Sequence, residues 1–81
     1  MGRKIKMIKI EKRGIVKKCR KLLGFKEWYI YIQDDEKDSG GYLIFYENPK
    51  NKKEAYDDWV ENKEKLEEYF EMEKLEVEWE K

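Results

Sequence analysis

The chain of 81 residues contains no histidine and a single cysteine, Cys19. Without histidine it lacks the most frequent general base of hydrolases and a frequent ligand of zinc. One cysteine forms no disulfide within the chain, which is typical of proteins kept in the reducing cytoplasm. We therefore expect a cytoplasmic protein that is not an enzyme and that binds no metal ion and no cofactor.

Long apolar runs are absent as well. No segment is long enough to serve as the apolar region of a signal peptide or to span a bilayer, so we expect no membrane contact. Pro49 is the only proline, and no linker rich in Pro, Gly or Ser divides the chain. The sequence predicts a single domain over residues 1–81. A domain this small buries only about 60% of its unfolded surface, so most of its aromatic rings are needed in the core.

The charged residues are numerous but balanced. They make up 47% of the chain, with 19 Lys and Arg against 19 Asp and Glu. The first 26 residues hold eleven of the basic side chains and one acid, Glu11, so the chain is basic at its start and acidic afterwards. A neutral whole removes the general electrostatic case for binding nucleic acid or a membrane. The composition does not indicate an oligomeric state.

The first third of the chain allows two interpretations. Apolar residues alternate with Lys over residues 4–11, which predicts a strand with a bulge between Met7 and Ile8. Residues 14–25 then show apolar side chains at helical spacing and end in Gly24, which predicts a short basic helix. The rival interpretation joins residues 5–22 into one long N-terminal helix.

The rest of the chain alternates between strand and helix patterns. Residues 28–33 and 42–47 alternate around an acidic turn and predict a hairpin. From Tyr56 to Phe70 apolar residues recur at helical spacing, which predicts a long acidic helix. Alternatively Asn62 caps a shorter helix and residues 55–60 are extended. Residues 74–81 carry Leu75, Val77 and Trp79 on one face and predict a strand.

This order predicts an α+β fold, a four-stranded mostly antiparallel sheet with two helices on one face, in the ferredoxin-like order βαββαβ. The alternative is a long N-terminal helix, a hairpin, an acidic helix and a C-terminal strand. In the ferredoxin-like order the first and last strands are neighbours. Lysines of the first strand would then face glutamates of the last: Lys4, Lys6 and Lys9 opposite Glu76, Glu78 and Glu80.

Two groups of side chains are candidates for binding. Carboxylates and large rings gather in the second half, a mixture that suits contact with a basic protein. This candidate partner-binding set is Tyr56, Asp57, Asp58, Trp59, Glu61, Glu64 and Glu68. The alternative is a small nucleic-acid-binding domain that would use the basic helix through Lys17, Lys18, Arg20 and Lys21. We do not favour this alternative, because a helix face paired with the acidic half explains the same cations.

The stretch DDWVENKEKLEEYF, with the preceding GGYLIFYE and the closing LEVEW, resembles the small, acidic, tryptophan-rich immunity proteins of bacterial toxin loci. The resemblance covers about the last two thirds of the chain. It implies a cytoplasmic bacterial protein that inhibits a partner protein, such as a toxin, by occluding it with an acidic aromatic surface. The basic first third departs from the acidic character of nuclease inhibitors.

Overall fold

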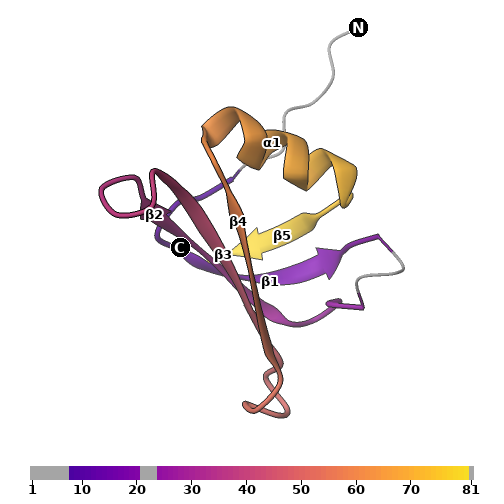
Figure 1. Ribbon diagram of the computed structural model, residues 1–81. Helices are drawn as coiled ribbons and strands as arrows, with labels where there is room; N and C mark the ends of the chain where they lie inside the picture. Colours follow the sequence, from indigo (N-terminus) through magenta and orange to yellow (C-terminus); the bar gives the residue numbers. More distant parts are fainter. Residues whose placement is uncertain (1–7, 21–23, 81) are drawn as a thin grey trace, which may run out of the picture.

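The computed structural model describes residues 8–20 and 24–80, which form five strands and one helix (Figure 1). The strands are β1 (Arg13–Lys18), β2 (Tyr29–Asp35), β3 (Gly41–Glu47), β4 (Ala55–Val60) and β5 (Glu76–Trp79), and α1 spans Lys63–Met72 between β4 and β5. They form a single sheet in the order β4-β3-β2-β1-β5, in which all neighbours are antiparallel. No described helix is long and apolar enough to cross a membrane.

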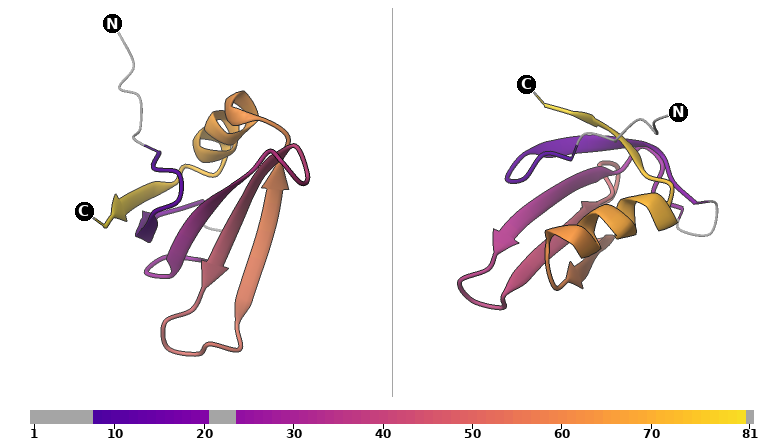
Figure 2. Two further views of the ribbon diagram at one scale, coloured as in Figure 1. Left: turned by 90° about the vertical axis from the view of Figure 1, so that its left-hand side faces the viewer. Right: turned by 90° about the horizontal axis from the view of Figure 1, so that it is seen from above.

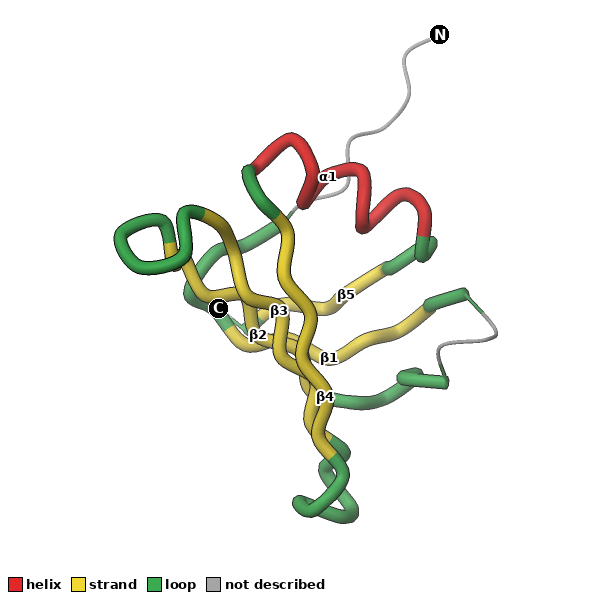
Figure 3. Tube along the Cα trace, viewed as in Figure 1, coloured by secondary structure: helices red, strands yellow, loops and turns green. Residues whose placement is uncertain are grey.

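The sheet is strongly twisted and curls around its core. Two further views show β2, β3 and β4 crossing the direction of β1 and β5, with α1 in the hollow of the curl (Figure 2). The tube trace shows the same course, with α1 linking the end of β4 to the start of β5 (Figure 3). The sheet therefore has an inner face, on which α1 packs, and an outer face that turns away from it.

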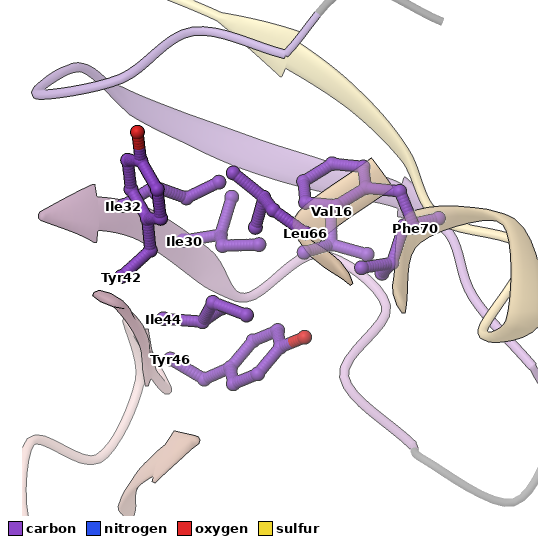
Figure 4. Packing of buried hydrophobic residues seen from close by; sticks show 9 residues of the cluster. Val16, Ile30, Ile32, Tyr42, Ile44, Tyr46, Leu66 and Phe70 are labelled. Atoms are coloured by element: carbon purple, nitrogen blue, oxygen red, sulfur yellow. The ribbon is translucent and has the colours of Figure 1, made fainter. Parts of the chain in front are cut away.

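The core lies between the inner face and α1. Alternate residues of the strands supply it, because successive side chains of a strand point to opposite faces. From α1, Leu66 and Phe70 point into the same space, as the close view shows (Figure 4). The buried residues of this core are Val16, Ile30, Ile32, Tyr42, Ile44, Tyr46, Leu66, Phe70 and Leu75.

The predicted fold class is wrong. The structure is a five-stranded antiparallel sheet with one short helix, mostly β, where we expected four strands and two helices. The ferredoxin-like order is therefore excluded, and so is the alternative with a long N-terminal helix. The hairpin is confirmed as β2 and β3, and the strand at residues 74–81 is confirmed as β5.

The expected basic helix at residues 14–25 is wrong, because residues 14–18 belong to β1, which pairs with β5, while residues 21–23 lie outside the described residues. A Cβ at Gly14 would lie 2.5 Å from Cγ1 of Val77 and 2.9 Å from Cε3 of Trp79, so only glycine fits opposite these side chains. A glycine that permits close approach is compatible with a strand interior. The branched side chains Ile15 and Val16 also favour the extended form.

The expected first strand at residues 4–11 lies partly outside the described residues. Its described part is not a strand, although Ile8 and Ile10 pack against the core. We expected the strand at residues 4–11 to lie beside the C-terminal strand, but β1 occupies that position beside β5. The charge pairing across the two strands exists, but between different residues: Arg13 with Glu80 at 2.9 Å, and Lys17 with Glu78 at 3.6 Å.

The long acidic helix is also wrong, and the alternative at this point is confirmed. Residues 55–60 are extended as β4, and Asn62 caps α1, accepting a hydrogen bond of 2.8 Å from the backbone N–H of Lys65. The helical spacing of Tyr56, Trp59 and Val60 was misleading, because in β4 Trp59 points to the opposite face from the other two. A cap satisfies an N–H that the first turn leaves free, which explains why the helix begins only here.

Candidate functional site

The outer face of the sheet is apolar over four adjacent strands. Residues that are direct partners in an antiparallel ladder point their side chains to the same face. The register joins Ile15 to Tyr29, Tyr31 to Phe45 and Leu43 to Trp59, all on the side opposite the core. We call the set Ile15, Tyr29, Tyr31, Leu43, Phe45 and Trp59 the outer patch.

The outer patch remains accessible to solvent. Five of its side chains are half-buried against one another, and Trp59 is 45% exposed. The one helix of the described residues, α1, packs on the inner face of the sheet through Leu66 and Phe70, so it does not cover the outer patch. An antiparallel sheet with one solvated face normally carries polar residues there. This face does not follow that pattern.

Trp59 is held in one position by two neighbours. Its indole Nε1 donates a hydrogen bond of 2.9 Å to the hydroxyl of Ser39 in the turn between β2 and β3. Its ring lies over Gly41, where a Cβ would come within 2.8 Å of Cε2 and Nε1 of the indole. The missing side chain of Gly41 therefore provides the space for the ring, and the hydroxyl fixes its orientation.

Tyr31 is held in a similar way by Glu11. The tyrosine hydroxyl donates to Oε1 of Glu11 at 2.8 Å, and the backbone N–H of Asp34 donates to Oε2 at 2.8 Å. The hydrogen bonds from Tyr31 and Asp34 lower the pKa of the Glu11 carboxyl, and the same bond raises the pKa of Tyr31. Glu11 adopts a positive φ of 63°, which is uncommon for a residue with a side chain. Both carboxylate oxygens of Glu11 accept a hydrogen bond, and these two bonds explain why Glu11 keeps this backbone conformation.

The border of the outer patch is acidic. Glu47 and Asp57 are direct partners of Tyr29 and Phe45, and Glu78 is the partner of Ile15. Arg13 and Lys17 also lie on this face, and each has carboxylate partners. Their ion pairs are Arg13 with Glu80 at 2.9 Å and Lys17 with Glu27 and Glu78 at 3.8 and 3.6 Å.

Arg13 shows what this face can hold. Its guanidinium lies 4.8 Å from the centre of the Tyr29 ring, and its Nε donates to Oε2 of Glu80 at 3.0 Å. The hydrogen bond and the charge of Glu80 raise the pKa of Arg13. A ring below and a carboxylate beside a cation are the components of a cation–π site.

The structure divides the predicted partner-binding residues between two surfaces. Asp57 and Trp59 lie at the outer patch, whereas Tyr56 and Asp58 face the inner side of β4. Tyr56 is 51% exposed and packs 5.5 Å from the Phe25 ring. The remaining predicted residues lie elsewhere: Glu61 follows β4, and Glu64 and Glu68 are exposed on α1. The predicted set is therefore divided among the outer face of β4, its inner face, the segment after β4, and α1.

The described residues of the predicted basic set do not lie on a helix. Lys17 and Lys18 belong to β1, Arg20 follows it, and Lys21 lies outside the described residues. Arg20 pairs with Glu73 through Nε and Oε1 at 3.2 Å, and Lys17 is paired as above. Cations already neutralised by carboxylates are poor contacts for phosphate.

The inner side of the sheet holds a tyrosine pair that serves packing. The hydroxyls of Tyr46 and Tyr69 lie 2.8 Å apart, and burial raises the pKa of both. The ring of Phe25 stacks on Tyr46 at 4.3 Å and is 4.9 Å from Trp28. These rings therefore pack against one another and against the core.

Sequence reasoning missed the partners of Trp59 on the outer patch, among them Tyr31, Leu43 and Phe45. A signal for them was available. In WYIYIQ and YLIFYE both alternate sets are apolar except for Gln33 and Glu47, so both faces of the hairpin are mainly apolar, whereas a hairpin with one solvated face shows mostly polar residues in one set. We expected most of the aromatic rings to be needed in the core.

Comparisons with protein-family models, with curated proteins and with solved structures found no match to this chain. Among the described residues no group of three or more Cys, Asp or Glu side chains is arranged to hold a metal ion. The candidate site is therefore defined by the geometry of the outer patch alone.

Proposed function

We propose that this protein binds a partner protein through the outer patch and inhibits that partner by occluding it. The observation that carries the proposal is a sheet face with six apolar residues on four adjacent strands, including Trp59 at 45% exposure. Contiguous apolar patches with a polar border mark protein interaction sites. Trp, Tyr and Phe are also the residues enriched at the centre of such interfaces.

The fixed position of Trp59 supports this proposal. A side chain that is already held in its bound orientation loses little conformational freedom when a partner docks, so more of the contact energy appears as affinity. Ser39 and Gly41 hold the indole in this way. Trp59 is therefore the expected hot spot of the interface.

The charge at the border indicates the chemistry of the partner. Arg13 and Lys17 are engaged in ion pairs, Lys17 with Glu78 among its partners, while Glu47 and Asp57 add negative charge around the patch. Such a surface attracts a basic partner and repels an identical copy of itself. We therefore expect a heteromeric complex with a protein that presents an apolar surface with a basic border.

An immunity-type inhibitor of a bacterial toxin fits this description, as the resemblance of residues 57–70 implies. In that case the complex forms in the cytoplasm, where the free thiol of Cys19 stays reduced. The structure gives no comparable support to nucleic-acid binding, because Lys17 and Arg20 are paired with carboxylates.

The test uses Trp59→Ala and a matched control, Met72→Ala. Met72 is 65% exposed on α1, away from the outer patch, so its substitution removes exposed apolar surface without touching the proposed site. The tagged wild type is used to capture proteins from the source cell, and the captured partner is purified and measured by calorimetry. Circular dichroism checks that both variants fold.

We expect Trp59→Ala to raise the dissociation constant of the complex by about 30-fold or more, as for an interface hot spot. Met72→Ala should leave the dissociation constant unchanged. Equal affinities of wild type and Trp59→Ala would contradict the proposal. So would a purified protein that associates only with itself through this face.

A further inference from the structure

An open pocket of about 380 Å³ lies beside the outer patch, at the part of the β3–β4 pair that leads to the connecting turn. Its walls come only from these two strands. The residues that form it are Phe45, Tyr46, Glu47, Ala55, Tyr56 and Asp57.

The register of the two strands shows which face the pocket opens on. Phe45 is the direct partner of Asp57, and Glu47 is the direct partner of Ala55. These four side chains therefore point to the outer face, and the strand segments of Tyr46 and Tyr56 lie beneath them. The small side chain of Ala55 leaves the space, and its three longer neighbours surround it.

The walls combine an aromatic ring with two carboxylates. An anion would be repelled by Glu47 and Asp57, and a neutral apolar group would remove water from both carboxylates without replacing their hydrogen bonds. A metal ion is not favoured here, because among the described residues no group of three or more Cys, Asp or Glu side chains is arranged to hold one. An organic cation on an apolar stem satisfies both kinds of wall.

The same face already holds a group of this kind. The guanidinium of Arg13 lies 4.8 Å from the centre of the Tyr29 ring and donates a hydrogen bond to Glu80. Tyr29 belongs to β2, the strand next to β3 of the pocket. Glu47 is the direct partner of Tyr29, and Asp57 is the direct partner of Phe45. Both carboxylates therefore lie beside a ring, as Glu80 does beside Tyr29.

We propose that this pocket receives an arginine side chain of the partner protein. The inference rests on the proposed function. A guanidinium is planar, stacks on a ring such as Phe45 and donates to two carboxylates at once, whereas an ammonium group does not stack. The arginine adds specificity beside the apolar contact made by Trp59.

The test needs no partner. The probes are capped single amino acids, Nα-acetyl-arginine amide, the lysine equivalent and the uncharged norleucine equivalent, titrated into ¹⁵N-labelled protein. We expect saturable shifts of the backbone amides of Ala55 and Asp57 with the arginine probe and none with norleucine. The double variant Glu47→Gln/Asp57→Asn should bind the arginine probe about fivefold more weakly, the loss expected for an exposed ion pair and a weakened cation–π contact.

The matched control is Glu64→Gln/Glu68→Gln, which removes the same charge from the exposed surface of α1. It should bind the arginine probe as the wild type does. Equal weakening in both double variants, equal shifts with norleucine, or equal affinity for lysine would overturn the arginine pocket.

This outcome is separable from that of the proposed function. If the arginine probe does not bind but partner affinity still depends on Trp59, the pocket is refuted and the outer patch stands. If the probe binds and Trp59→Ala leaves partner affinity unchanged, the pocket stands as a site for a guanidinium group, while the outer patch is refuted as the interface and with it the pocket's role in partner binding.

Discussion

Substituting Gly14 by alanine tests the pairing of β1 with β5, which shapes the inner side of the sheet. The new methyl group would lie 2.5 Å from Cγ1 of Val77, 2.9 Å from Cε3 of Trp79 and 3.1 Å from the carbonyl oxygen of Glu78. These distances are well below van der Waals contact, so side chains of β5 must move. The backbone of Gly14 does not adopt a positive φ, so no backbone strain adds to the effect.

The expected cost is about 1–2 kcal/mol of unfolding free energy. Overpacking of a core position costs about 1–3 kcal/mol. Replacing glycine by alanine at a compatible backbone position gains about 0.4–1 kcal/mol, because the unfolded chain loses freedom. The clash therefore exceeds the gain.

The measurement is urea unfolding followed by tryptophan fluorescence for Gly14→Ala, Val77→Ala and the double variant. Val77→Ala removes the nearest clashing atom, so the alanine at position 14 should cost about 1 kcal/mol less in that background, a coupling typical of residues in contact. Gly24→Ala is the control, because its added Cβ meets nothing within 4 Å and its positive φ gives a strain that Val77 cannot relieve. An equal cost of Gly14→Ala in both backgrounds would refute the β1–β5 arrangement.

Three further predictions concern single groups. Asn62→Ala removes the cap of α1 and should cost about 1 kcal/mol of unfolding free energy in the same assay; a change below about 0.3 kcal/mol would contradict the capping role. Burial raises the pKa of Tyr46 above its ordinary 10.0. The contribution of neutral Tyr46 to the unfolding free energy is therefore present in full below pH 10. It is lost as the pH rises above that value, by up to about 1.4 kcal/mol per pH unit. Tyr46→Phe should reduce that slope while losing the bond to Tyr69, and an unchanged slope would refute the assignment. Glu11 should titrate by NMR below the ordinary range of glutamate, so any stability it adds is lost as pH falls through that lowered pKa, and Tyr31→Phe should move the pKa upward.

The parts of the fold that depend on local pattern were predictable. The β2–β3 hairpin follows from alternation on both sides of an acidic turn, and β5 follows from the alternation of Val77 and Trp79 with glutamates. The cap at Asn62 was recognised from its residue type, but we ranked it below a long helix. A local pattern does not show which of two periodicities is used when the same apolar residues satisfy both.

The parts that depend on distant contacts were not predictable. β1 was missed because the role of Gly14 becomes clear only when Val77 and Trp79, more than sixty positions later, are placed opposite it. Of the candidate site, Asp57 and Trp59 were named in advance. Tyr31 and Phe45 were not, because their exposure depends on which face of the sheet α1 covers.

The most direct test of the central claim is NMR cross-saturation of the complex with the purified partner. The partner's protons are irradiated, and the loss of signal at each backbone amide of the ¹⁵N- and ²H-labelled protein is measured. We expect the strongest losses at Tyr31, Leu43, Phe45 and Trp59, and little loss along α1. The strongest losses along residues 63–72, with the outer patch unaffected, would contradict the account.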